Sequence, residues 1–292
     1  MLRTTRLAPW LYLTPLLLVL GFTFGYPLVA VFDFSLRRIR GASGPFIGLE
    51  NYRQVLKDGV FHEAVAHNAV LLLAVPLMTF IALILAVLLF DRPRGWRTYR
   101  SLLYVPFILA TPVVGVIFSN MLQLNGVVNE GLRTIGLSPL ALDWIGNPRL
   151  ALWTVMAVVV WREVGFGIVL FLARLMSINE DLLDAARVDG ASWWQRLRHV
   201  IVPQTKSVIE FFIVVSIITM LAWVFAYVYV ITHGGPGTAT MVMELYIFNF
   251  AFRMSQLPGI ASAVAVLLFL VTLAFMVPLF RLRSASEMEE MS

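Results

Sequence analysis

The 292-residue sequence contains no cysteine and few charged side chains. Without cysteine, the chain can form neither disulfide bonds nor thiolate metal sites. Charged residues make up 13% of the sequence and apolar residues 60%, whereas a soluble domain is about a quarter charged and about half apolar. So few charges cannot cover a water-facing surface, and no stretch has the composition of a separate soluble domain. We therefore expect much of the exterior to face lipid.

Six apolar stretches are long enough to cross a bilayer as helices, which takes about 20 residues. They comprise residues 8–34, 64–90, 101–122, 150–175, 208–231 and 260–280. Arg3 and Arg6 precede the first stretch as they would a signal peptide, but its apolar run exceeds the roughly 7–15 residues of a signal core, so we expect it to be retained. The pattern predicts an all-α polytopic membrane protein with about six transmembrane helices.

The distribution of arginine and lysine predicts the orientation of these helices. An even number of spans places both termini on one side, and more of the basic residues fall in the segments on that side. Because basic residues are enriched in cytoplasmic segments, we expect both termini to be cytoplasmic, although the cluster 37–40 lies in an outer loop. The net charge of +5 then reflects orientation and contact with lipid headgroups, and not nucleic-acid binding.

The inner loop at residues 177–203 has the pattern of two short amphipathic helices. Ser177 and Glu180 have the spacing of a capping box, which favours a helix start, and Gly190 suits a helix end. The second pattern, after Gly190, is typical of a helix lying among lipid headgroups. Pro203 is expected to break it before the fifth span. Taken alone, these features also fit an ordinary loop with two amphipathic helices.

Within this loop, Asp184-Ala185-Ala186 is followed after three residues by Gly190, and after nine more by Val200-Ile201-Val202-Pro203. This arrangement resembles the cytoplasmic motif of the inner-membrane permeases of binding-protein-dependent ABC importers, which reads Glu-Ala-Ala, three residues, Gly, nine residues and Ile-x-Leu-Pro. The substitutions of Asp for Glu and of Val for Ile and Leu retain charge and apolar character.

Other segments are similar to the sugar-importing branch of that family, which includes maltose and glycerol-phosphate permeases. They are the outer-loop segment 46–52, the entry to the fourth span at 143–151, Trp161 with Gly165-Phe166 inside that span, and 232–236 with Tyr246 and Ala251-Phe252 after the fifth. One position departs from the branch, where an acidic residue commonly follows the Phe of Phe225-Ala226. Transfer of the branch's substrate contacts to this chain is therefore not supported residue by residue.

The resemblance implies an architecture and a set of partners. An N-terminal helix and outer loop (1–63) would precede a five-helix type I importer core (64–281) and a cytoplasmic tail (282–292). The chain would pair with a second permease, two copies of an ABC ATPase and an extracytoplasmic solute-binding protein, in a bacterial or archaeal cytoplasmic membrane. The expected cargo is a sugar or a sugar derivative such as a polyol.

The same resemblance implies that a coupling helix seats in a groove on the ATPase. The residues assigned to it are Leu182, Asp184, Ala185, Ala186, Asp189, Gly190 and Pro203. Closure of the ATPase dimer on ATP would move the paired permeases from inward-facing to outward-facing. The chain lacks a GxxxxGK[ST] phosphate loop, so no cofactor is expected in it, and ATP and magnesium are assigned to the partner ATPase.

Arg162 and Glu163 lie near the middle of the fourth span. An arginine at that depth costs roughly 2.5–3.5 kcal/mol, so it is expected to face a cavity or a buried partner. Adjacent residues point about 100° apart on a helix, so the two are not expected to satisfy only each other. They either form an interhelical ion pair that fixes the packing or line the solute pathway. Candidate pathway residues are Trp161, Arg162, Glu163, Trp223, Tyr227 and Asn249, although aromatic residues are also common at membrane interfaces.

The sequence gives little support to a metal site or to two other classes of protein, a membrane-embedded enzyme and a transporter or channel that needs no ATPase. His62 and His67 are five residues apart, whereas the zinc-protease motif needs two histidines four apart on one helix face, so no metal site is predicted. A membrane-embedded enzyme would need a catalytic constellation, and none can be singled out. A transporter or channel that needs no ATPase would leave the motif at 184–203 without a role.

Overall fold

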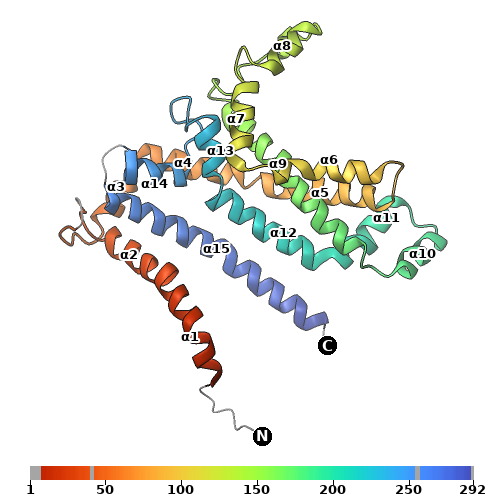
Figure 1. Ribbon diagram of the computed structural model, residues 1–292, viewed down its shortest axis with the longest axis horizontal. Helices are drawn as coiled ribbons and strands as arrows, with labels where there is room; N and C mark the ends of the chain where they lie inside the picture. The colour runs from red at the N-terminus through yellow and green to blue at the C-terminus, as the bar shows by residue number, and fades with distance from the viewer. Residues whose placement is uncertain (1–7, 40–42, 254–256, 291–292) are drawn as a thin grey trace. The chain divides into compact units, whose positions relative to one another are not determined.

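The computed structural model describes residues 8–39, 43–253 and 257–290, and these form helices and turns, with one isolated antiparallel bridge between Arg37 and Phe46. The all-α prediction is confirmed (Figure 1). The chain divides into a smaller unit, Met1–Phe61 with Tyr246–Leu270, and a larger unit, His62–Leu245 with Val271–Ser292.

Five helical segments are long and apolar enough to span a membrane, and a bent helix pair brings the total to as many as six. The five are Trp10–Ser35, Gly59–Phe90, Ala151–Leu175, Trp193–Ala222 and Pro258–Pro278. They correspond to five of the six predicted spans. The last belongs to α15 (Pro258–Glu290), so the predicted tail at 282–292 continues the helix as far as Glu290.

The third predicted span is not one helix. Residues 101–122 fall on α6 (Trp96–Ile108) and α7 (Thr111–Met121), which meet at an angle of 96°. Leu109 and Ala110 between them are extended, with ψ of 137° and 135°. Pro112 has no N–H to donate to the carbonyl of Ile108, so a straight helix could not continue through it. The third predicted stretch is therefore a bent pair of helices that can count as one broken span.

The fifth predicted span also differs. A helix beginning at Trp193 runs through α11 (Trp193–Arg196), the π-helical turn η3 (Leu197–Ile201) and α12 (Val202–Ala222), and α13 (Phe225–Ile231) is separate. The predicted break at Pro203 was wrong. The wider π turn, closed by the N–H of Val202 on the carbonyl of Leu197, ends just before Pro203 and so accommodates a residue that an α-helix interior would exclude.

In the larger unit, α9 (Ala151–Leu175) is the central helix. It packs against α5 (Ala74–Phe90), α6 and α12, and α13 packs on α7. Two glycines of α9 make this packing close. A Cβ on Gly165 would lie 2.6 Å from the carbonyl oxygen of Leu103, and one on Gly167 would lie 2.7 Å from the Cβ of Ala82. Interfaces between membrane helices are enriched in such small residues because they let backbones approach.

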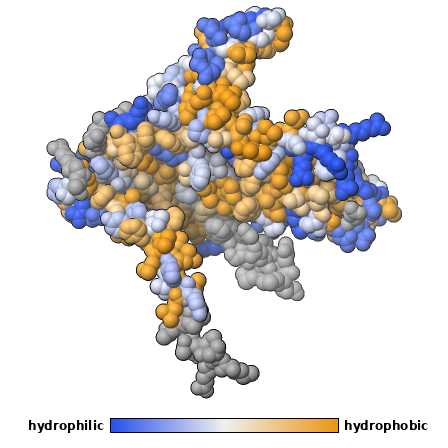
Figure 2. All heavy atoms as spheres, in the orientation of Figure 1, coloured by the Kyte–Doolittle hydropathy of each residue, from blue (hydrophilic) through white to orange (hydrophobic). Residues whose placement is uncertain are grey.

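The remaining elements of the larger unit lie at the ends of these helices or beside them. They are α4 (Gly59–Leu71), α8 (Val127–Thr134), the 3₁₀ turn η2 (Ser138–Leu140), α10 (Glu180–Val188) and α14 (Met243–Phe248), the last extending into the smaller unit. Figure 1 shows α10 and α11 together beyond one end of α5, α6 and α9. In Figure 2 hydrophilic residues gather at that end of the larger unit, as expected of a segment outside the bilayer.

The smaller unit contains α1 (Ala8–Leu20), the π turn η1 (Gly21–Gly25), α2 (Tyr26–Ser35), α3 (Glu50–Val55) and the π turn η4 (Asn249–Arg253). The buried side chain of Asn51 donates to the backbone carbonyls of Ser35 at 2.8 Å and Arg37 at 2.9 Å. The Tyr52 hydroxyl donates to the Ser35 side chain at 2.7 Å. Segment 46–52 therefore binds the C-terminal end of α2 through Asn51 and Tyr52.

Candidate functional site

The helix to which the coupling role was assigned, α10, begins two residues later than predicted. Asn179 is the N-cap of α10, and its side chain accepts from the backbone N–H of Asp181 at 3.0 Å. Ser177 closes the end of α9 instead, since its hydroxyl donates to the carbonyl of Arg174 at 2.7 Å. The capping box predicted at Ser177 was therefore wrong, because an asparagine N-cap starts the helix equally well.

The predicted helix end at Gly190 is confirmed. Its φ is +74°, a left-handed conformation that glycine adopts without strain. The N–H of Gly190 donates to the carbonyl of Arg187 and the N–H of Ala191 to that of Ala186, both at 3.0 Å. This pair of bonds is the Schellman motif. A Cβ built on Gly190 would meet no atom of this chain within 4 Å.

One face of α10 packs against the chain and the other is open. Leu183 is 6% exposed, whereas Leu182 and Val188 are 47% and 87% exposed. Ala185 and Asp189 are also exposed, and Asp184 pairs with Arg187 at 2.7 Å within the same helix. Large apolar side chains left in water are costly, so this face of α10 has the composition of a contact surface for another protein.

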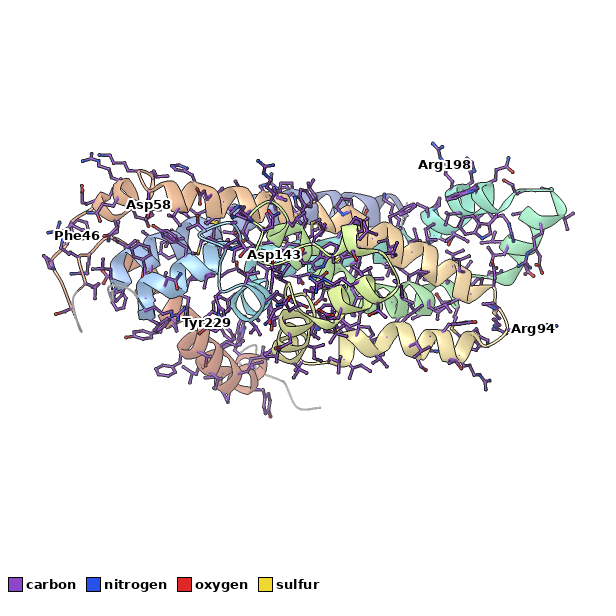
Figure 3. The ribbon with its side chains drawn as sticks, turned by 90° about the horizontal axis from the view of Figure 1, so that it is seen from above. Phe46, Asp58, Arg94, Asp143, Arg198 and Tyr229 are labelled. Atoms are coloured by element: carbon purple, nitrogen blue, oxygen red, sulfur yellow. The ribbon has the colours of Figure 1, made fainter. Side chains whose placement is uncertain are left out.

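The packed face of α10 lies beside the C-terminal end of α5. A cleft of about 240 Å³ there is lined by Phe90, Asp91, Arg92, Leu183, Asp184 and Arg187. Figure 3 shows Arg94, in the α5–α6 turn, and Arg198, in η3, at the same end of the larger unit. Residues of α10 and of the C-terminal end of α5 thus line one cleft, and α10 packs on η3.

Inside the bundle, Arg162 of α9 is at the centre of a polar network. Its Nε and Nη2 donate to the carbonyl oxygen of Leu109 at 3.1 and 3.0 Å, and its Nη1 donates to Glu163 at 2.5 Å and to the Tyr227 hydroxyl at 3.1 Å. Tyr227 in turn donates to Glu163 at 2.8 Å. The Arg162 guanidinium lies 5.2 Å from the centroid of the Phe107 ring. Arg162 and Glu163 do pair, and as expected neither relies only on the other.

The bend between α6 and α7 explains this network. An extended residue in the middle of a membrane helix leaves its backbone carbonyl without a helical N–H partner, which is costly in lipid. Leu109 is that residue, and both of the donors it receives come from Arg162. The network therefore ties the bend to α9 and, through Tyr227, to α13.

The other three predicted pathway residues belong to different elements or surfaces. Trp161 is half exposed and lines an apolar groove of about 540 Å³ with Trp144 and Trp153, between α7, α8 and α9. Trp223 is exposed at the break between α12 and α13. Asn249 is buried in η4 of the smaller unit. Of the six residues, the structure thus brings together Arg162, Glu163 and Tyr227.

Sequence reasoning missed one buried acid, Glu244 of α14, outside the helices long enough to span the membrane. Its carboxylate oxygens are buried and make no hydrogen bond within the described residues. Burial raises the pKa of Glu244 to about 7, although the nearby backbone of Phe225 and Val224 and the Asn68 side chain act in the opposite direction. A single glutamate in a loop gives no sequence signal for this, because its burial depends on the tertiary packing around Asn68.

Comparison with known proteins agrees with this architecture. Residues 69–285 match the family described as "Binding-protein-dependent transport system inner membrane component". The chain is 32% identical to the probable ABC transporter permease protein YurN of Bacillus subtilis, covering 94% of this chain and 95% of that protein. It is 30% identical to the lactose transport system permease LacF of Rhizobium radiobacter, covering 91% of each.

Two further comparisons extend the match. The trehalose/maltose transport system permease MalF of Thermococcus litoralis is 32% identical, covering 91% of this chain and 90% of that protein. The fold matches a chain in the crystal structure of a bacterial ABC transporter involved in the import of the acidic polysaccharide alginate, with a TM-score of 0.83, 21% identity and 94% of each chain covered. The chain therefore belongs to the family of binding-protein-dependent transport system inner membrane components.

Proposed function

We propose that this chain is one of two permease subunits of an ATP-driven importer that carries a sugar or sugar derivative into the cytoplasm. The observation that supports this most strongly is α10, a short capped helix with an exposed apolar face at one end of the bundle. That face fits a groove on a separate ATPase, which would hold ATP and magnesium. Relatives named for lactose and for trehalose and maltose support a sugar as the cargo.

In this proposal both termini are cytoplasmic, and an extracytoplasmic binding protein delivers the solute from the other side. The family description supports dependence on a binding protein. ATP binding would close the ATPase dimer, displace α10 and so displace α5 beside it. The solute pathway would open alternately to either side between the two permeases.

The role proposed for Arg162, Glu163 and Tyr227 is to hold the α6–α7 bend against α9 and α13 while the bundle moves. The network supports this role because every guanidinium nitrogen of Arg162 already donates a hydrogen bond to the protein, leaving little capacity for a solute. Trp161 and Trp223 are exposed and remain the candidates for contact with solute or with the second permease.

The proposed function is tested by reconstituting the chain in liposomes with its second permease, its ATPase and its binding protein. We expect ATP hydrolysis to rise, and solute to accumulate, only when the binding protein carries one particular sugar. Accumulation by liposomes that lack the ATPase subunit would contradict the proposal, because it would show a transporter that needs no ATP.

A further inference from the structure

A groove of about 400 Å³ lies where the start of α6 packs on α9. It is lined by Trp96, Arg97, Arg100, Ser101, Tyr104 and Val169. Gly165 brings the two helices together further along, where its missing side chain leaves room for the carbonyl of Leu103. Towards the start of α6, Val169 is the residue of α9 that lines the groove.

The groove has an uncompensated positive charge. Arg97 and Arg100 are exposed, and within the described residues no carboxylate forms an ion pair with either of them. The Arg97 guanidinium lies 5.8 Å from the centroid of the Trp96 ring. Guanidinium groups bind phosphate oxygens with charge-assisted hydrogen bonds, and basic pockets between helices on the cytoplasmic side suit anionic lipid headgroups.

The chemical character of α6 changes along this face. Arg97, Arg100, Ser101 and Tyr104 share one side of the helix because they lie at i, i+3, i+4 and i+7. The same side continues to Ile108, which is 65% exposed. Ile108 is about 16 Å from Arg97 along the helix axis, at 1.5 Å per residue. The face thus passes from guanidinium groups through hydroxyl groups to an aliphatic surface.

That order is the order of groups in a glycerophospholipid: a phosphate, then glycerol esters, then an acyl chain. We infer that this groove binds one anionic glycerophospholipid, with its phosphate on Arg97 and Arg100 and an acyl chain along Val105 and Ile108. The inference rests on the cytoplasmic placement of the α5–α6 turn in the proposed function. A free phosphate would use the arginines but would gain nothing from the exposed aliphatic surface beyond them.

The test is titration of the full-length chain in detergent with a fluorescent phosphatidylglycerol, compared with a phosphatidylcholine carrying the same acyl chains. We expect the phosphatidylglycerol to bind more tightly, and Arg97→Gln with Arg100→Gln to weaken its binding on the order of tenfold, since two charge contacts are lost. Glycerol 1-phosphate should not displace it at equal concentration, because that competitor lacks the acyl chains.

The matched control is Arg92→Gln with Arg94→Gln, which removes the same charge from the preceding α5–α6 turn, outside the groove. Arg97→Lys with Arg100→Lys keeps the charge and should retain most of the binding, and a melting curve for each variant shows whether it is folded. Equal weakening by the two glutamine pairs would overturn the inference, as would equal binding of the two lipids. Displacement of the phosphatidylglycerol by glycerol 1-phosphate would also overturn the inference, because it would show that the groove binds a free phosphate.

Discussion

Gly190→Leu is expected to abolish ATP-driven uptake while the protein still inserts in the membrane. Gly190 has a φ of +74° and meets no atom of this chain, so a leucine there adds backbone strain but no internal clash. The strain is on the order of 1 kcal/mol, too small to unfold the bundle. The added side chain would instead project beside the exposed face of α10 and keep the ATPase from seating. Uptake into proteoliposomes and the amount of inserted protein are the two measurements.

Gly136→Leu is the matched control for this variant. Gly136 has a φ of +80° and likewise meets no atom within 4 Å, but it lies in the predicted outer loop at 123–149. The two substitutions therefore impose the same backbone strain in different places. Normal uptake by Gly190→Leu, or equal loss of uptake in both variants, would contradict the coupling role of Gly190.

Arg162→Ala is expected to destabilise the larger unit by about 3–5 kcal/mol, as for removal of one partner from a buried ion pair, and to eliminate uptake. Both side chains of the pair are 13% exposed. The substitution leaves Glu163 with Tyr227 as its remaining partner and removes both donors from the carbonyl of Leu109. The melting temperature of the detergent-purified chain and its uptake activity after reconstitution measure the two effects.

Arg133→Ala is the control for that prediction. Arg133 also pairs with a glutamate, Glu130, at 2.6 Å and also donates to a backbone carbonyl, that of Leu124, but the two side chains are 35% and 60% exposed, well above the 13% of the buried pair. Its loss should cost no more than about 1 kcal/mol. A melting temperature for Arg162→Ala that matches wild type would show that the network does not hold the α6–α7 bend.

The general course of the chain was predictable because it depends on local composition. Apolar runs of the length of a bilayer located the spans, and Gly190 marked the end of α10 because the left-handed conformation requires glycine or a similar residue. The low frequency of charge inside the spans singled out Arg162 and Glu163. These signals are carried by one residue or one run of residues, and the structure departs from them where α6 and α7 bend and where the fifth stretch divides into α12 and α13.

One departure depends on a contact between distant segments, and the others depend on local alternatives that propensity does not resolve. The bend at Leu109 is tolerated because Arg162, 53 residues further along, satisfies its carbonyl, and no local pattern records that pairing. The π turn before Pro203 keeps the helix continuous where proline alone would predict a break. Two possible caps, Ser177 and Asn179, lie two residues apart, and propensity does not choose between them. The assignment of Trp161, Trp223 and Asn249 to the pathway stays a prediction.

The central claim is that α10 touches an ATPase subunit, and the absence of cysteine from the chain allows a direct test. Val188→Cys places a single thiol on the exposed face of α10, and Val127→Cys places one at similar exposure on α8, which Figure 1 shows away from α10. In the assembled complex, a short thiol-to-amine cross-linker should join position 188, but not position 127, to the ATPase. Free labelling of position 188 by a bulky maleimide, with no cross-link, would contradict the account.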